Sequence, residues 1–140
     1  MTMLDDLITF LRERLLTRKA IAVQARDALD RWESGNDPEQ RWSLDGSVIG
    51  VNLKGEYCCL GEEVSRFIGL RPPEQEIAEA DALLQIVELA KAANGLEDVI
   101  EAEFSYGRDG ENDPLVGDSI LKQLALPYAD HPEYREEWRP

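Results

Sequence analysis

The side chain best suited to acid–base chemistry is a single histidine, His131, which stands between Asp130 and Pro132 near the end of the chain. With one histidine, no Ser/His/Asp or Cys/His arrangement can be argued from the sequence. An aspartate in such a turn commonly bonds backbone groups just downstream. We therefore interpret His131 as part of a local turn and assign no catalytic residue.

The two cysteines, Cys58 and Cys59, are neighbours in the sequence. In a strand they would point to opposite faces, so they cannot chelate one ion together. A disulfide between adjacent residues would also be strained, and no CxxC spacing indicates zinc. We interpret the pair as structural, with one thiol buried as a small apolar group.

Carboxylates offer the remaining chemistry. The segment "DGENDP" holds Asp109, Glu111 and Asp113, but it lacks the sixth-position glycine and the closing glutamate of an EF-hand loop. A solvated loop explains it, and we expect no metal site and no cofactor. The alternative is a metal-dependent enzyme that uses Glu62, Glu63 or the acids of 109–113.

The net charge of −14 is unevenly distributed. Residues 1–33 carry six acidic and six basic side chains, so residues 34–140 hold the whole excess. Such a surface repels nucleic acid, because a binder must neutralise phosphates with Lys and Arg, and we expect no direct nucleic acid binding. The acid-rich stretch 74–118 leaves a second hypothesis open, an acidic mimic of nucleic acid that inhibits a host DNA-binding protein.

A long amphipathic helix is predicted over residues 1–34. Thr2 can cap it, and Asp5 and Asp6 suit the positive end of the helix dipole. Its apolar residues recur in alternating steps of four and three, a pattern that predicts a helical seam: Leu4, Ile8, Leu11, Leu15, Ala22, Ala25, Leu29 and Trp32. Basic residues every seven positions beside this seam suit a partner helix. That partner is either the acidic helix at 74–94 of the same chain or the same helix of a second copy in a homodimer.

The segment 41–60 predicts a three-stranded antiparallel meander. β-Branched and aromatic residues cluster at 41–45, 47–53 and 56–60, between Asp-Gly and Lys-Gly turn signals. Three strands need a packing partner for one face, so helices should cover it.

Residues 73–126 are predicted to be largely helical. Pro73 suits the start of a core helix at 73–94, and Gly95 is its expected stop. A shorter helical region follows, and a last helix near 117–125 ends before Pro127. We therefore predict one α+β domain over 1–140, with a tail at 127–140.

The tail is unusually rich in rings. Tyr128, Tyr134 and Trp138 can lie in apolar surface of the same chain, which would hold the terminus in place. Tyr and Trp also dominate binding hot spots, so a docking peptide for another protein is the alternative.

The tail sequence "LALPYADHPEYREEWRP" resembles the C-terminal signature of a family of small uncharacterised proteins of actinobacteria and their phages, a domain of unknown function. The "FLRERL" stretch at 10–15 and the Arg41-Trp42 pair resemble the same family by order and pattern. The resemblance implies an actinobacterial or actinophage origin. It implies no activity, cofactor or catalytic residue.

These observations favour a non-enzymatic protein–protein interaction or accessory protein of a phage or mobile element. The partner would be an unidentified host or phage protein, or a second copy bound through the N-terminal helix. No stretch is apolar enough to span a membrane, and a cytoplasmic location is expected. The residues expected to make contact are Leu4, Ile8, Leu11, Leu15, Tyr128, Tyr134 and Trp138.

Overall fold

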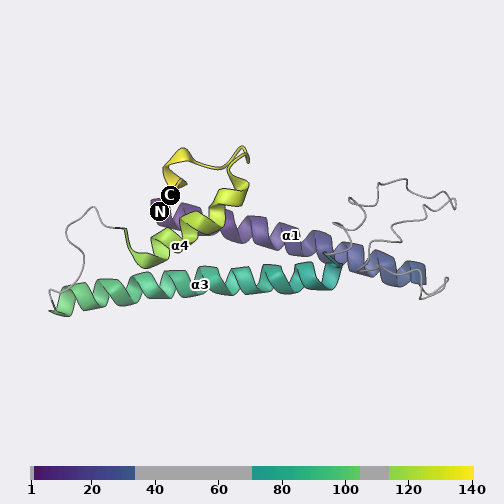
Figure 1. The fold of residues 1–140 in the computed structure, drawn as a ribbon, viewed down its shortest axis with the longest axis horizontal. Coiled ribbons are helices and arrows are strands. Elements are labelled where there is room, and N and C mark those ends of the chain that lie inside the picture. The colour runs from purple at the N-terminus through teal and green to yellow at the C-terminus, as the bar shows by residue number, and fades with distance from the viewer. Residues whose placement is uncertain (1, 34–70, 105–113) are drawn as a thin grey trace. The chain divides into compact units, whose positions relative to one another are not determined.

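The computed structural model describes residues 2–33, 71–104 and 114–140. These ranges contain the helices α1 (Met3–Glu33), α3 (Pro73–Phe104) and α4 (Val116–Ala125), followed by the short 3-10 helices η2 (Leu126–Tyr128) and η3 (Glu136–Trp138) (Figure 1). The chain divides into two compact units. The first unit consists of Met1–Thr17 and Asp81–Pro140, and the second of Arg18–Ala80.

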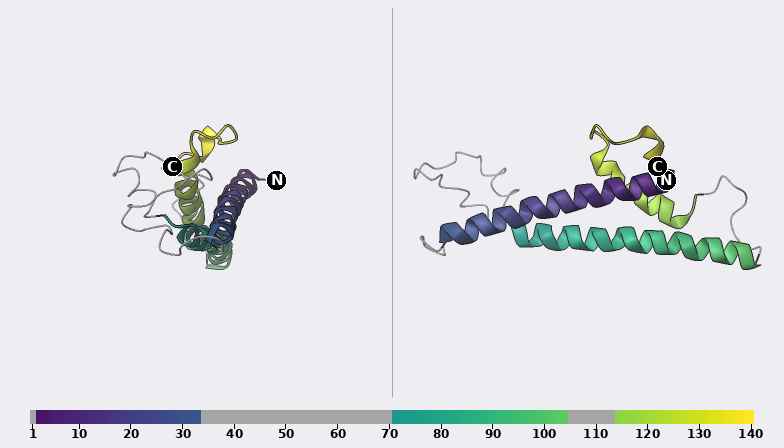
Figure 2. Two further views of the ribbon diagram at one scale, coloured as in Figure 1. Left: turned by 90° about the vertical axis from the view of Figure 1, so that its right-hand side faces the viewer. Right: turned by 180° about the vertical axis from the view of Figure 1, so that it is seen from behind.

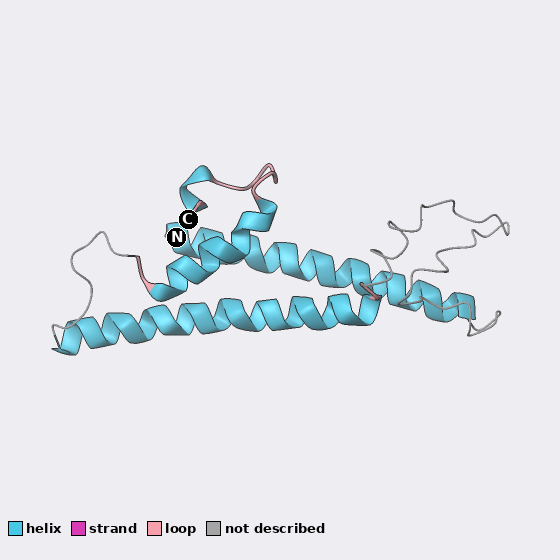
Figure 3. Cartoon of the chain, in the orientation of Figure 1, coloured by secondary structure: helices cyan, strands magenta, loops and turns pink. Residues whose placement is uncertain are grey.

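The α+β class expected from the sequence is wrong. Every regular element in the described ranges is helical, and none of them is a strand (Figure 3). The class was inferred from β-propensity and turn dipeptides in one short segment, whereas helical periodicity runs through most of the remaining chain. The expected meander at 41–60 lies outside the described residues.

Helix α1 begins as its sequence predicts. The Thr2 hydroxyl accepts a hydrogen bond from the Asp5 backbone N–H at 3.2 Å, and the Thr2 backbone N–H donates to Asp5 Oδ2 at 3.0 Å. This reciprocal arrangement satisfies backbone donors at the helix start. The Thr2 backbone N–H, and then the Thr2 hydroxyl, which donates to Asp5 Oδ2 at 2.8 Å, hold the pKa of the Asp5 carboxyl below its ordinary value.

Helix α3 begins at Pro73, as expected, but it does not stop at Gly95. It continues to Phe104. A Cβ built on Gly95 would meet nothing within 4 Å, so no packing reason requires a glycine or a break there. A glycine inside a helix costs about 1 kcal/mol relative to alanine, which the contacts of a long helix can outweigh.

The first unit contains the main hydrophobic core. The first half of α1, α3 from Asp81, α4 and the tail contribute to it, and Figure 2 shows α4 and the tail beside the start of α1. Its buried side chains share one cluster: Leu7, Ile8, Phe10, Leu11, Leu15, Val87, Ala90, Leu121, Ala125 and Trp138. Gly117 lets α4 approach α3 closely, because a Cβ there would overlap the Ala90 carbonyl oxygen and the Asn94 side chain.

In the second unit, Arg18 joins the C-terminal half of α1 to the start of α3. Its guanidinium Nε donates to Glu76, and Nη2 donates to Glu79 Oε2 at 2.7 Å. Arg71 also lies 3.6 Å from Glu76. The hydrogen bond from Arg18, together with the charges of Arg18 and Arg71, lowers the pKa of Glu76. Ala22, Pro73 and Ala80 are buried in the described part of this unit.

The two long helices pair within one chain, as one of the two sequence-based alternatives expected. In the first unit, Arg12 Nε donates to Glu88 Oε1 at 2.9 Å. Both side chains are largely exposed, so the ion pair itself contributes little to stability. Among the described helices, none combines the length and hydropathy needed to cross a membrane.

Candidate functional site

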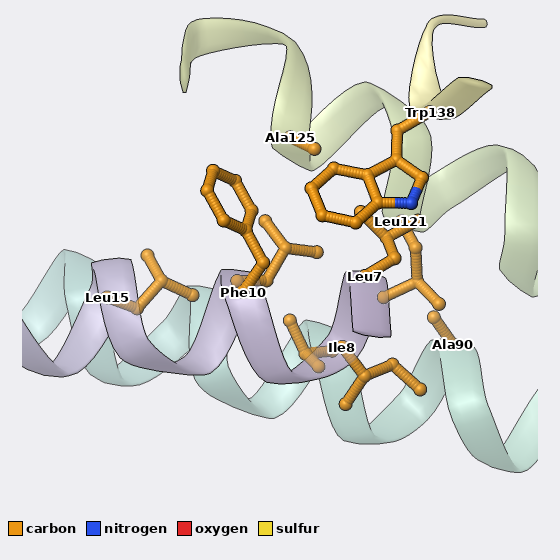
Figure 4. Close-up of a cluster of buried hydrophobic side chains, with 10 residues drawn as sticks. Leu7, Ile8, Phe10, Leu15, Ala90, Leu121, Ala125 and Trp138 are labelled. Atoms are coloured by element: carbon orange, nitrogen blue, oxygen red, sulfur yellow. The ribbon is translucent and has the colours of Figure 1, made fainter. Parts of the chain in front are cut away.

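Phe10 is the centre of an aromatic cluster that joins α1 to the tail. Four rings surround it, with centroids between 5.0 and 6.3 Å away: Tyr128, His131, Tyr134 and Trp138. Figure 4 shows the Phe10 ring on α1 beside the Trp138 indole. Tilted and edge-to-face pairs contribute about 0.5–1.5 kcal/mol each beyond the burial of their area.

The Tyr134 and Trp138 side chains are held in this cluster by ring packing and not by hydrogen bonds of their own. Trp138 is 2% exposed, yet its indole N–H is buried without a hydrogen-bond partner. The Tyr134 hydroxyl is likewise buried and unpaired. Leaving such groups unsatisfied costs free energy. The apolar contacts of the rings therefore outweigh this cost.

His131 has partners at both imidazole nitrogens. Nε2 contacts Arg14 Nη1, and Nδ1 accepts a hydrogen bond from the Glu133 backbone N–H at 3.2 Å. The Arg14 guanidinium also lies over the Phe10 ring, 5.6 Å from its centroid, and 3.4 Å from Glu133. The histidine is thus tied into the contact between α1 and the tail, a long-range contact that the interpretation as a local turn did not include.

A groove of about 440 Å³ lies between α1 and the tail. Phe10, Tyr134 and Trp138 supply its rings, and the ion pair from Arg135 Nη1 to Asp6 Oδ2, at 2.8 Å, joins its two walls. The other charged residues of the groove, Glu13 and Glu133, pair with Arg14, which does not line it. The groove is therefore a packed contact between α1 and the tail, lined by aromatic rings and by charged groups at its rim.

The seven residues expected to bind a partner meet in the core of the first unit. Four are buried: Ile8, Leu11, Leu15 and Trp138. The other three are partly buried against the same cluster: Leu4, Tyr128 and Tyr134. The chain itself occupies the apolar surface that these residues were expected to offer to a partner.

The candidates for metal and thiol chemistry fall outside the described residues. They are Cys58, Cys59, Glu62, Glu63, Asp109, Glu111 and Asp113. Within the described ranges, no three His, Cys, Asp or Glu side chains are grouped so that they could hold a metal ion.

Helix α3 carries a second apolar surface that the sequence analysis missed. We define the outer face of α3 by six residues of the first unit: Ala82, Ile86, Leu89, Ala93, Leu96 and Ile100. The four large side chains are exposed by 38, 67, 62 and 39%, in chain order. Val99, at 52%, lies beside them. Large exposed apolar surface of this kind marks interaction sites.

A signal for this face is present in the sequence. Its residues alternate in steps of four and three, while the buried residues Ala80, Val87 and Ala90 fall on the other side of the same helix. A helix with apolar residues on two sides has a second side on which a neighbour can pack. The core helix expected at 73–94 did not include this second apolar side.

Neither a curated protein nor a solved structure shows a significant match to this chain. The family described as "Family of unknown function (DUF6221)" matches residues 4–140. Because this match covers almost the whole chain and includes α1, α3, α4 and the tail, the protein belongs to that family.

Proposed function

We propose that this protein is a non-enzymatic protein–protein interaction protein that binds its partner through the outer face of α3. The observation that supports the proposal is the row of exposed large apolar side chains at Ile86, Leu89, Leu96 and Ile100. Burying one such side chain contributes about 1.5–3 kcal/mol. An accessory role in a phage or mobile element is supported by the resemblance of the tail alone.

The face has the form of a docking surface for a helix. Its steps of four and three place the six residues in one narrow stripe, the pattern that packs side chains of one helix between those of another. The α1 seam has the same pattern, but the core of the first unit already covers its residues from Leu4 to Leu15. The outer face of α3 is therefore the better candidate for contact with a partner.

No observation on the described residues favours the nucleic acid mimic. A mimic must hold free carboxylates in a row. Four acids of α3 are instead engaged by groups of the chain itself: Glu76, Glu79, Glu88 and Glu97.

Photo-cross-linking in cells tests the proposal. Benzoylphenylalanine in place of Leu96 should form an adduct with a protein, because this side chain lies on the outer face. The same group in place of Ala102, which is exposed on another side of α3, is the matched control and should form none. Equal adducts at both positions, or none at position 96, would contradict the proposal.

A further inference from the structure

The outer face of α3 is a preformed helical seam. Its residues span Ala82 to Ile100, about 27 Å of helix at 1.5 Å per residue. The opposite side of α3 is already packed in the core through Val87 and Ala90. Contacts within the chain therefore already order α3. A partner that binds the outer face does not bear the entropic cost of forming the helix, and such preorganisation favours binding.

We propose that the partner is a second copy of this chain, paired through the same face with the two α3 helices antiparallel. This inference rests on the proposed function and names its partner. The symmetry is that of a twofold dimer, in which each copy presents the same patch to the other.

The antiparallel register places a large side chain opposite a small one in four of its six layers. When Ile86 lies opposite Leu96 of the second copy, Leu89 lies opposite Ala93 and Ala82 opposite Ile100. The twofold axis repeats each layer, so six apolar layers follow one another without interruption. Alternation of large and small side chains in this way fills the space between two helices.

Charge does not distinguish the two orientations. The antiparallel register brings Glu103 of one copy opposite Glu79 of the other, and a parallel pair would bring Glu103 opposite Glu103. The match of large and small side chains therefore carries the choice of the antiparallel pair. Beside the seam this register places neutral residues together, with Gln85 near Val99 and Ala92 near Ala92 of the second copy.

The neutral margin of the face distinguishes a second copy from a basic partner. Helices that select a different chain commonly do so through charged residues beside the seam. Here one margin consists of Gln85, Ala92 and Val99 and offers no carboxylate for such a selection. The other margin consists of Leu83, Ala90 and Glu97, and the Glu97 carboxylate accepts a hydrogen bond from the Val116 backbone N–H within the chain. An identical face, neutral along the same margin, is the complementary surface.

The salt dependence of binding distinguishes a second copy from a basic partner. Each chain carries a net charge of −14, so two copies repel, and salt screens this repulsion. The dimer should therefore tighten as the salt concentration rises. A complex with a basic partner would weaken under the same change.

Sedimentation equilibrium of the full chain, over about 1 µM to 1 mM, tests the dimer. We expect a monomer–dimer equilibrium that shifts toward dimer with salt. Leu89→Glu should raise the dissociation constant by roughly a hundredfold, because two leucines leave the interface of each dimer. Ala102→Glu adds the same charge outside the face and should leave the constant unchanged. A monomer throughout the range, or equal effects of the two substitutions, would overturn the proposal.

The photo-cross-link at position 96 tests the orientation without altering the charge. In the antiparallel dimer the adduct joins the tryptic peptide that ends at Lys91 of the second copy. In a parallel dimer it joins the peptide 92–108, which would overturn the proposed arrangement. An adduct with a different protein would overturn self-pairing and leave the proposed function standing, whereas no adduct at all would contradict both.

Discussion

Phe10 and Trp138 lie with their ring centroids 5.0 Å apart and their planes inclined by 43°, although they stand near opposite ends of the chain. Both side chains are almost fully buried, at 4 and 2% exposure. The contact explains why a short tail is so rich in rings. It closes the core of the first unit over α1, so the last residues of the chain contribute to stability.

Removing the indole should therefore destabilise the whole first unit. We expect Trp138→Ala to lower the free energy of unfolding by about 3–5 kcal/mol, since a large buried ring is lost and a cavity remains beside Phe10. Urea unfolding followed by circular dichroism measures the change. Glu137→Ala, at the exposed neighbouring position, should stay within about 0.5 kcal/mol of the parent protein. Equal stability of the two variants would show that the tail is dispensable.

Two glycines of the first unit should respond to alanine in opposite directions. Gly117→Ala places a methyl group against the Ala90 carbonyl and within 2.6 Å of Asn94 Cγ, so α4 must move away from α3. We expect a loss of at least about 2 kcal/mol in the free energy of unfolding. Gly95→Ala meets nothing and should stabilise the protein by about 0.5–1 kcal/mol. Thermal unfolding distinguishes the pair, and a stabilised Gly117→Ala variant would refute the close contact between α3 and α4.

The start of each long helix could be predicted because its signals are local. Thr2 and Asp5 satisfy the first backbone donors of α1, and Pro73 fits a first helical position, whatever the rest of the chain does. Gly95 shows the limit of such signals. A glycine permits a helix to end, but whether it ends depends on the contacts on either side.

The composition of the core could be predicted only in part. The spacing in α1 identified Ile8, Leu11 and Leu15 but omitted Leu7 and Phe10, which are equally buried. A narrow seam corresponds to one neighbouring helix, whereas α3, α4 and the tail cover α1 over a wider stripe. Sequence spacing does not reveal how many neighbours a helix has. For the same reason a core helix was expected at 73–94 and the outer face of α3 was missed.

Arg135 should depend on its planar shape as well as its charge. Its guanidinium lies 5.3 Å from the centroid of the Trp138 ring and pairs with Asp6 at 2.8 Å. Arg135→Lys keeps the charge but loses the flat contact with the indole, so we expect a loss of about 0.5–1 kcal/mol in unfolding free energy. The control is Arg139→Lys, whose parent side chain pairs with Glu136 on the surface and should matter little. If the two lysine variants are equally stable, stacking on Trp138 contributes nothing measurable.

Acid should weaken the second unit through Glu76. Hydrogen bonding from Arg18, followed by the charges of Arg18 and Arg71, places the folded-state pKa of Glu76 below its ordinary value of 4.5. Folding therefore favours the charged form. Its contribution to stability is complete above the ordinary pKa and is lost as the pH falls through the lower, folded-state pKa. We expect this contribution to be about 1–2 kcal/mol, as for a hydrogen bond to a charged group.

Glu76→Gln should accordingly lower stability at pH 7 and flatten the decline of stability below pH 4.5. Urea unfolding at a series of pH values measures both effects. Glu74→Gln, in the same first turn of α3 but exposed, is the matched control, because it removes one carboxylate outside the pairing with Arg18. The Glu74→Gln variant should lose stability below pH 4.5 as steeply as the parent protein does. A Glu76→Gln variant with that same steep decline would show that the ion pairs of Arg18 do not govern the acid sensitivity of this unit.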